Sequence, residues 1–266
     1  MIKNIKLFYN DEEKTKKAAG IVKEKLIANK FKIVEENYDL AIAIGGDGAF
    51  LRMVRRTNFN SNIFYVGINT GTLGFIQEVT MDNLDDFIEA LKRSKYRIEK
   101  VGIQESNIYC SEYQDKVYSL NEIIVRDVNL KIAKLTIKID GDLLERFIGD
   151  GVLVCSSFGS TGHNISYDGA IMYNSMGALQ LTPIAPLNSK VYRTIFNSII
   201  IPEHKKISIE PDNENVLVTI DGENREYMGV VKIETGIGNK SIKCLRLSYY
   251  SFPNKVNEKL LGRGYN

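Results

Sequence analysis

A short apolar run that ends in a glycine-rich turn constrains the fold of this chain more than any other feature. Residues 39–44 form a nearly continuous apolar run, and Gly45-Gly46-Asp47-Gly48 follows it directly. Such a run predicts a strand covered on both faces, and residues 49–54 predict the start of a helix. Glycines let the backbone approach a ligand closely, and a helix N-terminus offers free N–H groups to phosphate. This junction therefore predicts a site for a phosphorylated or nucleotide-like ligand.

The carboxylate in this turn does not fit phosphate binding alone, because Asp47 would repel the anion. It must coordinate a metal, accept a hydrogen bond from a hydroxyl, or take up a proton. The chain has only two histidines, His163 and His204, so a general base is expected to be a carboxylate. The turn matches neither the Gly-x-Gly-x-x-Gly pattern nor the Walker A pattern. A plain strand-to-helix turn without a ligand is the alternative.

The first hundred residues alternate strand and helix patterns. Strands are predicted at 5–9, 39–44 and 62–68, and helices at 11–30 and 80–92. Thr80 is the candidate N-cap of the second helix. Alternating strands and helices indicate an α/β domain with a parallel sheet, in which ligands sit beyond the carboxyl ends of the strands. The glycine turn lies at one such end.

Strand patterns dominate from about residue 97 to residue 251. Residues 134–139 alternate apolar and polar side chains, and Asp140-Gly141 and Asp221-Gly222 are turn signals. Two further strands are predicted at 230–234 and 242–247. These patterns indicate an antiparallel, sandwich-like β domain. The predicted domains are 1–98 (α/β, with the glycine turn), 99–251 (β-rich) and a tail, 252–266, which we expect to pack on the first domain.

Composition excludes several classes of partner. The net charge of +2 does not indicate the strongly basic surface that nucleic-acid binding requires. The longest apolar runs are too short to span a membrane, and the N-terminus carries no signal-peptide pattern, so a cytoplasmic location is predicted. The three cysteines, Cys110, Cys155 and Cys244, are widely spaced and support neither a zinc site nor a disulfide framework.

Three further segments carry polar residues where a site would need them. Residues 69–75 hold two glycines, two threonines and Phe75, a ring able to stack on a base. Asn121-Glu122 interrupts a strand pattern and offers an amide and a carboxylate to ribose hydroxyls or a base edge. Residues 149–166 run from a strand into a stretch rich in serine and glycine. Each has a plain alternative: a surface loop with a buried ring, a polar pair on an edge strand, and a serine-glycine loop.

Taken together, these segments resemble the NAD kinase family. The resemblance rests on Gly45-Gly46-Asp47-Gly48, Asn69-Thr70-Gly71 with Leu73-Gly74-Phe75, Asn121-Glu122, Gly149-Asp150-Gly151, and Gly159-Ser160-Thr161. Each motif is weak alone, but their order over residues 1–250 is specific. The first motif is shared with diacylglycerol, sphingosine and phosphofructo kinases.

The resemblance implies an enzyme with its active site between an α/β domain and a β domain. Such enzymes phosphorylate the adenosine 2′-hydroxyl of NAD, with ATP or polyphosphate as the donor and a divalent metal such as Mg²⁺. They work as homodimers or homotetramers. Nothing in the sequence assigns the ligands of the metal.

Residue roles follow from the same resemblance. Asp47 matches the catalytic aspartate, and Gly45, Gly46 and Gly48 would bind phosphate, with Gly48 also beside the substrate. Phe75 would lie near the adenine, Asn121 and Glu122 would hold the adenosine ribose and base, and Asp150 would contact the nicotinamide half. The segment along the dinucleotide is Thr161, Gly162, His163, Asn164, Ile165 and Ser166. Ala185 would add a further NAD contact, from a neighbouring subunit.

The chain departs from the family pattern at three places. Gly162 and His163 replace a common Ala-Tyr pair, Ile148 stands where many members have arginine, and Thr72 replaces a common histidine. Affinity and cofactor preference are the properties these changes affect. Two alternatives stay open: a lipid or sugar kinase that shares the glycine turn, and an NAD- or NADP-binding protein without turnover.

Overall fold

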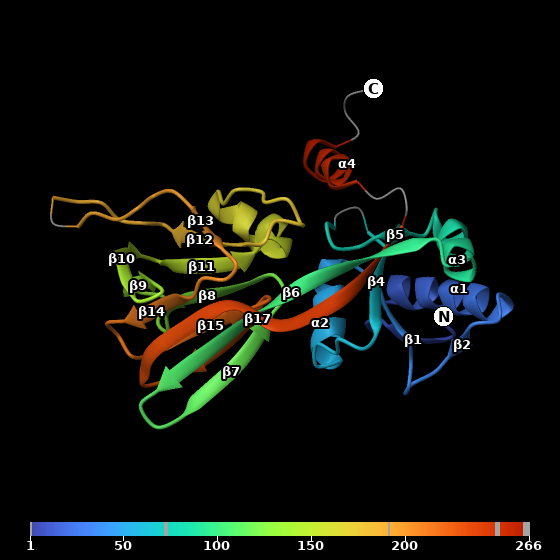
Figure 1. Ribbon diagram of the computed structural model, residues 1–266, viewed down its shortest axis with the longest axis horizontal. Helices are drawn as coiled ribbons and strands as arrows, with labels where there is room; N and C mark the ends of the chain where they lie inside the picture. The colour runs from blue at the N-terminus through green and yellow to red at the C-terminus, as the bar shows by residue number, and fades with distance from the viewer. Residues whose placement is uncertain (1, 72–73, 191, 248–250, 263–266) are drawn as a thin grey trace. The chain divides into compact units, whose positions relative to one another are not determined.

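The computed structural model describes residues 2–71, 74–190, 192–247 and 251–262. These form two compact units, Met1–Val101 with Lys240–Asn266, and Gly102–Asn239. The division falls inside two long paired strands, β6 (Tyr96–Cys110) and β17 (Val230–Leu247), which run alongside each other in Figure 1.

The first unit is built on a parallel sheet with the strand order β2-β1-β3-β4, and β4 also pairs in parallel with β5 and the end of β17. The strands are β1 (Asn4–Phe8), β2 (Lys32–Ile33), β3 (Leu40–Ile44), β4 (Phe64–Asn69) and β5 (Val79–Thr80). The helices are α1 (Glu13–Ala28), α2 (Asp47–Arg56), α3 (Leu84–Lys92) and α4 (Phe252–Val256), followed by a π-helical turn, η3 (Asn257–Leu261).

Strand β3 is buried along its whole length, as its apolar run predicts. Leu40, Ile42 and Ile44 join the core that β3 shares with α1 and α3. Because side chains alternate along a strand, the small Ala41 and Ala43 point to the other face, where α2 packs against the sheet. The predicted α/β domain with a parallel sheet is confirmed.

The second unit contains two antiparallel sheet regions. One has the order β13-β12-β11-β8-β15-β16. The other has the order β10-β9-β14-β17, and β6 pairs with β17 and in turn with β7. Besides β6 and β17, these sheets contain β7 (Gln114–Ser119), β8 (Glu122–Asp127), β9 (Ala133–Ile139), β10 (Asp142–Gly149), β11 (Gly151–Ser156), β12 (Ala178–Ile184), β13 (Ile199–Pro202), β14 (Ile207–Pro211), β15 (Val216–Ile220) and β16 (Glu223–Tyr227).

One apolar core joins the facing sides of these sheets. Val125 and Val154 from one sheet share it with Ile137 and Ile209 from the other. The outer side of the β8–β11–β12 region carries a smaller cluster that includes Met172 and is flanked by Tyr167. The polar segment after β11 therefore covers the outer side of this sheet, and the predicted sandwich-like β domain is confirmed.

Two local predictions are wrong. Thr80 does not cap α3, because it pairs in parallel with Asn69 as part of β5; the helix begins at Leu84 behind Asn83, whose side-chain oxygen accepts the Thr80 N–H at 2.7 Å. The strands predicted at 230–234 and 242–247 are one continuous strand, β17, since its polar centre still pairs with neighbouring strands. Within the described ranges, no helix is both long and apolar enough to cross a membrane.

Candidate active site

The glycine turn joins β3 to α2 in the first unit. Gly45 has a φ of +140°, and its N–H donates to the Ile68 carbonyl at 3.0 Å. A Cβ atom at Gly45 would lie 3.0 Å from that of Ala49, so backbone angle and space both favour glycine. Gly46 is the N-cap of α2, which begins at Asp47. The turn thus presents the N-terminus of a helix beyond the carboxyl end of a buried strand.

The Asp47 carboxylate is held by the loop that follows β4. Its two oxygens accept the backbone N–H groups of Phe75, at 2.7 Å, and Ile76, at 3.1 Å. A Cβ atom at Gly74 would lie 2.8 Å from Asp47 Oδ1, so glycine makes room for this contact. A carboxylate has about four acceptor positions, and two hydrogen bonds leave capacity for a ligand. The structure therefore brings Asp47 and Phe75 together; Thr72 lies outside the described residues.

Gln77 completes this arrangement and was missed in the sequence. Its side-chain amide donates to the Gly46 carbonyl at 2.6 Å. It lies over Gly67 in β4, where a Cβ atom would fall 1.6 Å from Gln77 Oε1. An isolated glycine within a strand pattern signals such a close approach, so Gly67 was the available clue.

In the second unit, Asn121 and Glu122 lie where β7 gives way to β8. The Asp221 carboxylate accepts the backbone N–H groups of Leu120 and Asn121, each at 2.8 Å, and of Glu122 at 3.2 Å. The sequence marked Asp221 only as a turn residue. Its part in holding this junction depends on a contact between residues a hundred positions apart, for which the sequence carries no local signal.

Two oxygen atoms of this junction are buried without a hydrogen-bond partner among the described residues: Asn121 Oδ1 and Glu122 Oε2. Asn121 is 6% exposed and Glu122 is 3% exposed. Burial, followed by the charge of Asp221, raises the pKa of Glu122 to about 8, while the His163 backbone N–H acts in the opposite direction. Buried acceptors without partners are unfavourable, so this pair is suited to a ligand that brings hydrogen-bond donors.

The predicted binding segment packs directly on this junction. Its residues form two short 3₁₀ turns, η1 (Phe158–Thr161) and η2 (His163–Tyr167). A Cβ atom at Gly159 would lie 2.1 Å from the Asn121 carbonyl oxygen, and one at Gly162 would lie 3.0 Å from Asn121 Nδ2 and 3.3 Å from Glu122 Oε2. Glycine at these positions lets the segment approach the Asn121 backbone, the Asn121 amide nitrogen and the Glu122 carboxyl group.

Within this segment, Asn164 holds the turn together. It is fully buried; its amide donates to Ser160 and Ala170 carbonyls, and its oxygen accepts from Gln180 and Thr182 at 2.7 Å each. Thr161 and Ile165 are half-buried, whereas Ser166 is exposed. Asn164 therefore fixes the path on which its neighbours are presented.

His163 is exposed and stacks near Tyr167, with ring centroids 5.1 Å apart. The Tyr167 hydroxyl accepts a hydrogen bond from Arg126, whose guanidinium lies over the same ring. Partial burial, with a contribution from Arg126, lowers the pKa of His163, which favours a neutral imidazole at pH 7. The sequence did not single out Arg126 or Tyr167.

Asp150 and Ala185 lie next to each other in the second unit. The Asp150 N–H donates to the Ile184 carbonyl at 2.9 Å, and Ala185 follows with a positive φ of 43°. A Cβ atom at Gly149 would lie 2.7 Å from the Ala185 carbonyl oxygen. A cavity of about 590 Å³ is lined by Ala185, Ser166 and the neighbouring Tyr167 and Phe196, among others. The structure therefore brings Ser166 and Ala185 to one cavity. Ile148, one of the departures, is buried.

A carboxylate in a glycine turn at a strand end, with a β unit that offers buried acceptors to a ligand, defines a nucleotide-binding phosphotransferase. Residues 5–96 match the ATP-NAD kinase N-terminal domain, and residues 120–242 match the ATP-NAD kinase C-terminal domain. The chain belongs to the NAD kinase family.

Individual relatives agree with this assignment. The chain is 40% identical to the NAD kinase of Finegoldia magna over 239 residues, which cover 86% of this chain and 87% of the relative. It is 30% identical to NAD kinase 2 of Bacillus licheniformis, with 97% and 98% covered.

Two solved structures share the fold. A yeast NADH kinase complexed with NADH aligns with a TM-score of 0.86 at 21% identity, covering 100% of this chain and 89% of that one. An NAD kinase from Archaeoglobus fulgidus in complex with ATP aligns with a TM-score of 0.77 at 20% identity, covering 98% and 100%.

Proposed function

We propose that this chain transfers the γ-phosphoryl group of ATP to the adenosine 2′-hydroxyl of NAD and releases NADP. The observation that carries the choice of acceptor is the pair of buried oxygens, Asn121 Oδ1 and Glu122 Oε2, which have no partner among the described residues. A ribose hydroxyl both donates and accepts hydrogen bonds and the adenine amino group donates them, so they would satisfy both atoms whether Glu122 is charged or protonated. A lipid acceptor would instead offer an apolar chain to these two polar atoms.

Asp47 is the proposed general base. In the transfer, a bond forms between the ribose 2′-oxygen and the γ-phosphorus, and the bond from that phosphorus to the β–γ bridging oxygen breaks. The 2′-hydroxyl proton passes to the Asp47 carboxylate, whose two backbone hydrogen bonds fix its orientation. Gly45, Gly46 and Gly48 let the start of α2 approach the donor phosphates, and positioning supplies much of the acceleration.

A divalent metal such as Mg²⁺ fits the glycine turn. Mg²⁺ is usually bound by one or two carboxylates together with substrate phosphates, and it keeps several waters. Asp47 retains acceptor capacity beyond its two backbone contacts, so it is the residue that would hold the ion. When bound, the metal would neutralise charge on the transferred phosphate.

Other residues are assigned supporting roles in the same proposal. Phe75 is half-buried and would lie near the adenine. Asp150 would contact the nicotinamide half, and Ala185 would add a further NAD contact from a neighbouring subunit. The segment from Thr161 to Ser166 would follow the dinucleotide, with Asn164 holding its shape. A homodimer or homotetramer and a cytoplasmic location stay predictions.

The proposal is tested by incubating the protein with NAD, ATP and Mg²⁺ and measuring NADP with an NADP-specific dehydrogenase. Parallel reactions replace NAD by a sphingoid base or by fructose 6-phosphate and follow ATP consumption. NADP formation with no turnover of the other acceptors is expected. Phosphorylation of the lipid or the sugar instead, or tight NAD binding without NADP from ATP or polyphosphate, would overturn it.

A further inference from the structure

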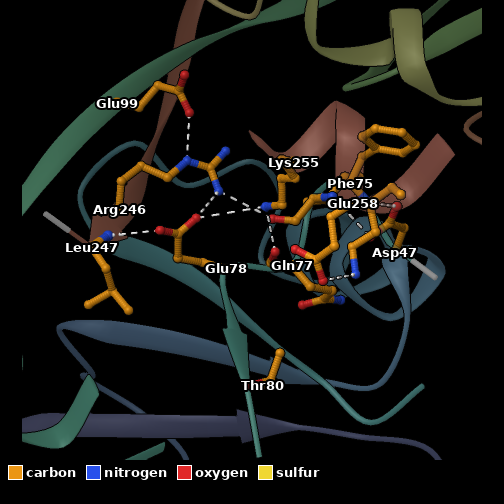
Figure 2. Close-up of polar contacts among 12 residues, drawn as sticks. Asp47, Phe75, Gln77, Glu78, Thr80, Glu99, Arg246, Leu247, Lys255 and Glu258 are labelled. Carbon is orange, nitrogen blue, oxygen red and sulfur yellow. Dashed lines mark hydrogen bonds and ion pairs between the residues drawn. The ribbon is translucent and has the colours of Figure 1, made fainter. Parts of the chain in front are cut away.

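A buried group of charged side chains underlies the loop that holds Asp47. Arg246, in β17, donates to Glu99 at 2.7 Å and lies 3.4 Å from Glu78, which also accepts the Leu247 N–H at 2.9 Å. Figure 2 shows Arg246 between the two carboxylates, and Lys255 reaching the same Glu78 oxygen as Arg246. Glu78 and Arg246 are each only 2% exposed in their side chains. The group therefore pairs two carboxylates with two cationic side chains, and buried charges are costly unless they are paired in this way. Its members are Glu78, Glu99, Arg246 and Lys255.

Lys255 is the member of this group that reaches toward the active site. It lies on α4, and its side chain is 12% exposed. Its ammonium group donates to the Gln77 carbonyl at 2.6 Å and lies 3.8 Å from Glu78 Oε2. A charged donor makes a stronger hydrogen bond than a neutral one, so this hydrogen bond strengthens the attachment of α4 to the loop that follows β4.

Gln77 connects this contact to the glycine turn. Its side chain donates to the Gly46 carbonyl, and the two residues before it, Phe75 and Ile76, donate their N–H groups to Asp47. Fixing the Gln77 carbonyl therefore fixes the short stretch of backbone that orients Asp47. Figure 2 shows Gln77 between Lys255 on one side and Asp47 on the other.

We propose that Lys255 is a positioning residue for phosphoryl transfer: it anchors the Gln77 backbone and so holds Asp47 ready to accept the 2′-hydroxyl proton. The inference rests on the proposed function of Asp47. It assigns a role in turnover to the C-terminal segment, which contributes none of the family motifs. Lys255 also places an ammonium group beside the loop that holds Asp47.

The surroundings of Lys255 make its charge sensitive to pH. Burial, followed by the charge of Arg246, lowers the pKa of Lys255 to about 8, while Glu78 and Asp47 act to raise it and Lys259 acts to lower it. Glu99 contacts the group at Arg246, and its charge also acts on Glu78. The ammonium form is therefore present below pH 8 and is lost as the pH rises through that value, which would weaken its hydrogen bond to the Gln77 carbonyl.

The test compares three full-length variants, Lys255→Met, Lys255→Arg and Lys259→Met, in the NADP assay. Lys259 is the matched control: it lies four residues further along the same segment and pairs with Glu258 at 3.6 Å. Loss of one charged hydrogen bond predicts that Lys255→Met lowers kcat roughly 10- to 100-fold and changes the KM for NAD less than about threefold. Glu78 keeps Arg246 and the Leu247 N–H in this variant, so the fold is expected to survive, as circular dichroism would show.

Lys255→Arg keeps its charge at all accessible pH values, and the adjoining cavity of about 250 Å³ gives room for the larger head group. Its kcat should stay close to that of the wild type below pH 8 and exceed it increasingly above pH 8. Because Glu122 titrates in the same range in both proteins, the readout is the ratio of the two kcat values. This ratio tests the inference even if Lys255→Met does not fold.

The outcomes separate the inference from the proposed function. A wild-type protein that makes no NADP would contradict the function itself. A wild-type protein that makes NADP, with Lys255→Met equally active or with Lys259→Met equally impaired, would overturn the role of Lys255. A ratio of arginine-variant to wild-type kcat that stays constant through pH 8 would overturn it as well.

Discussion

Glu122 makes the second unit sensitive to pH in a way that one substitution should abolish. Burial raises the pKa of Glu122 from its ordinary value of 4.5 to about 8 in the folded protein. The folded state thus binds the proton more tightly than the unfolded state does. The stability that this provides is fully present below pH 4.5 and is lost as the pH rises to about 8. At about 1.4 kcal/mol per pKa unit, the loss amounts to about 5 kcal/mol.

Glu122→Gln replaces the carboxyl group by a neutral group of similar shape, which cannot titrate. With a urea dependence of about 3 kcal/mol per M for a unit of this size, the wild-type urea midpoint should fall by about 1–2 M between pH 5 and pH 8.5. The variant should lose most of that fall. Circular dichroism at fixed protein concentration measures both curves.

The control is Glu112→Gln, which removes an exposed carboxylate in the same unit and should leave the wild-type pH dependence in place. Parallel curves for the wild type and Glu122→Gln would refute the reasoning, because they would show that Glu122 is not held protonated by its burial. A pH dependence that disappears in Glu112→Gln as well would do the same.

Three further substitutions test the packing of the site. Gly74→Ala places a methyl group 2.8 Å from Asp47 Oδ1 and should lower kcat roughly tenfold or more, by displacing the carboxylate; an unchanged kcat would contradict the observed orientation of Asp47. Gly67→Ala collides with Gln77 and should lower the melting temperature by several degrees as well as kcat, and a loss of neither would show that the Gln77 contact is dispensable. Asn164→Ala removes four buried hydrogen bonds and should destabilise the second unit by about 2–4 kcal/mol, seen as a lower urea midpoint; an unchanged midpoint would argue against its role in holding the turn.

The sequence predicted those parts of the fold that are encoded locally. The apolar run before Gly45 predicts a strand buried on both faces, and the alternation in residues 134–139 predicts a strand buried on one face. Both segments form the expected strands, β3 and β9. Thr80 shows the limit of such reasoning. Its capping chemistry favoured a helix start, but pairing with Asn69 placed it in a strand, and that pairing depends on tertiary structure.

The residues of the candidate site likewise fall into those that the sequence shows and those that only the structure shows. The glycine turn and Asn121-Glu122 were visible because unusual residue types stand next to each other. Asp221, Gln77 and Lys255 were not, since each acts through a contact with backbone far away in the sequence. Ordinary aspartate, glutamine and lysine residues carry no mark of such a partner, and only the folded chain brings the partners together.

The most direct test of the account is the kcat for NADP formation in Asp47→Asn at saturating NAD and ATP, with NAD binding measured on the same protein. The asparagine cannot take up the 2′-hydroxyl proton, so kcat should fall by roughly 100-fold or more while NAD affinity changes less than about threefold. Turnover close to the wild-type value in a variant that folds and binds NAD would contradict the assignment of Asp47 as the general base.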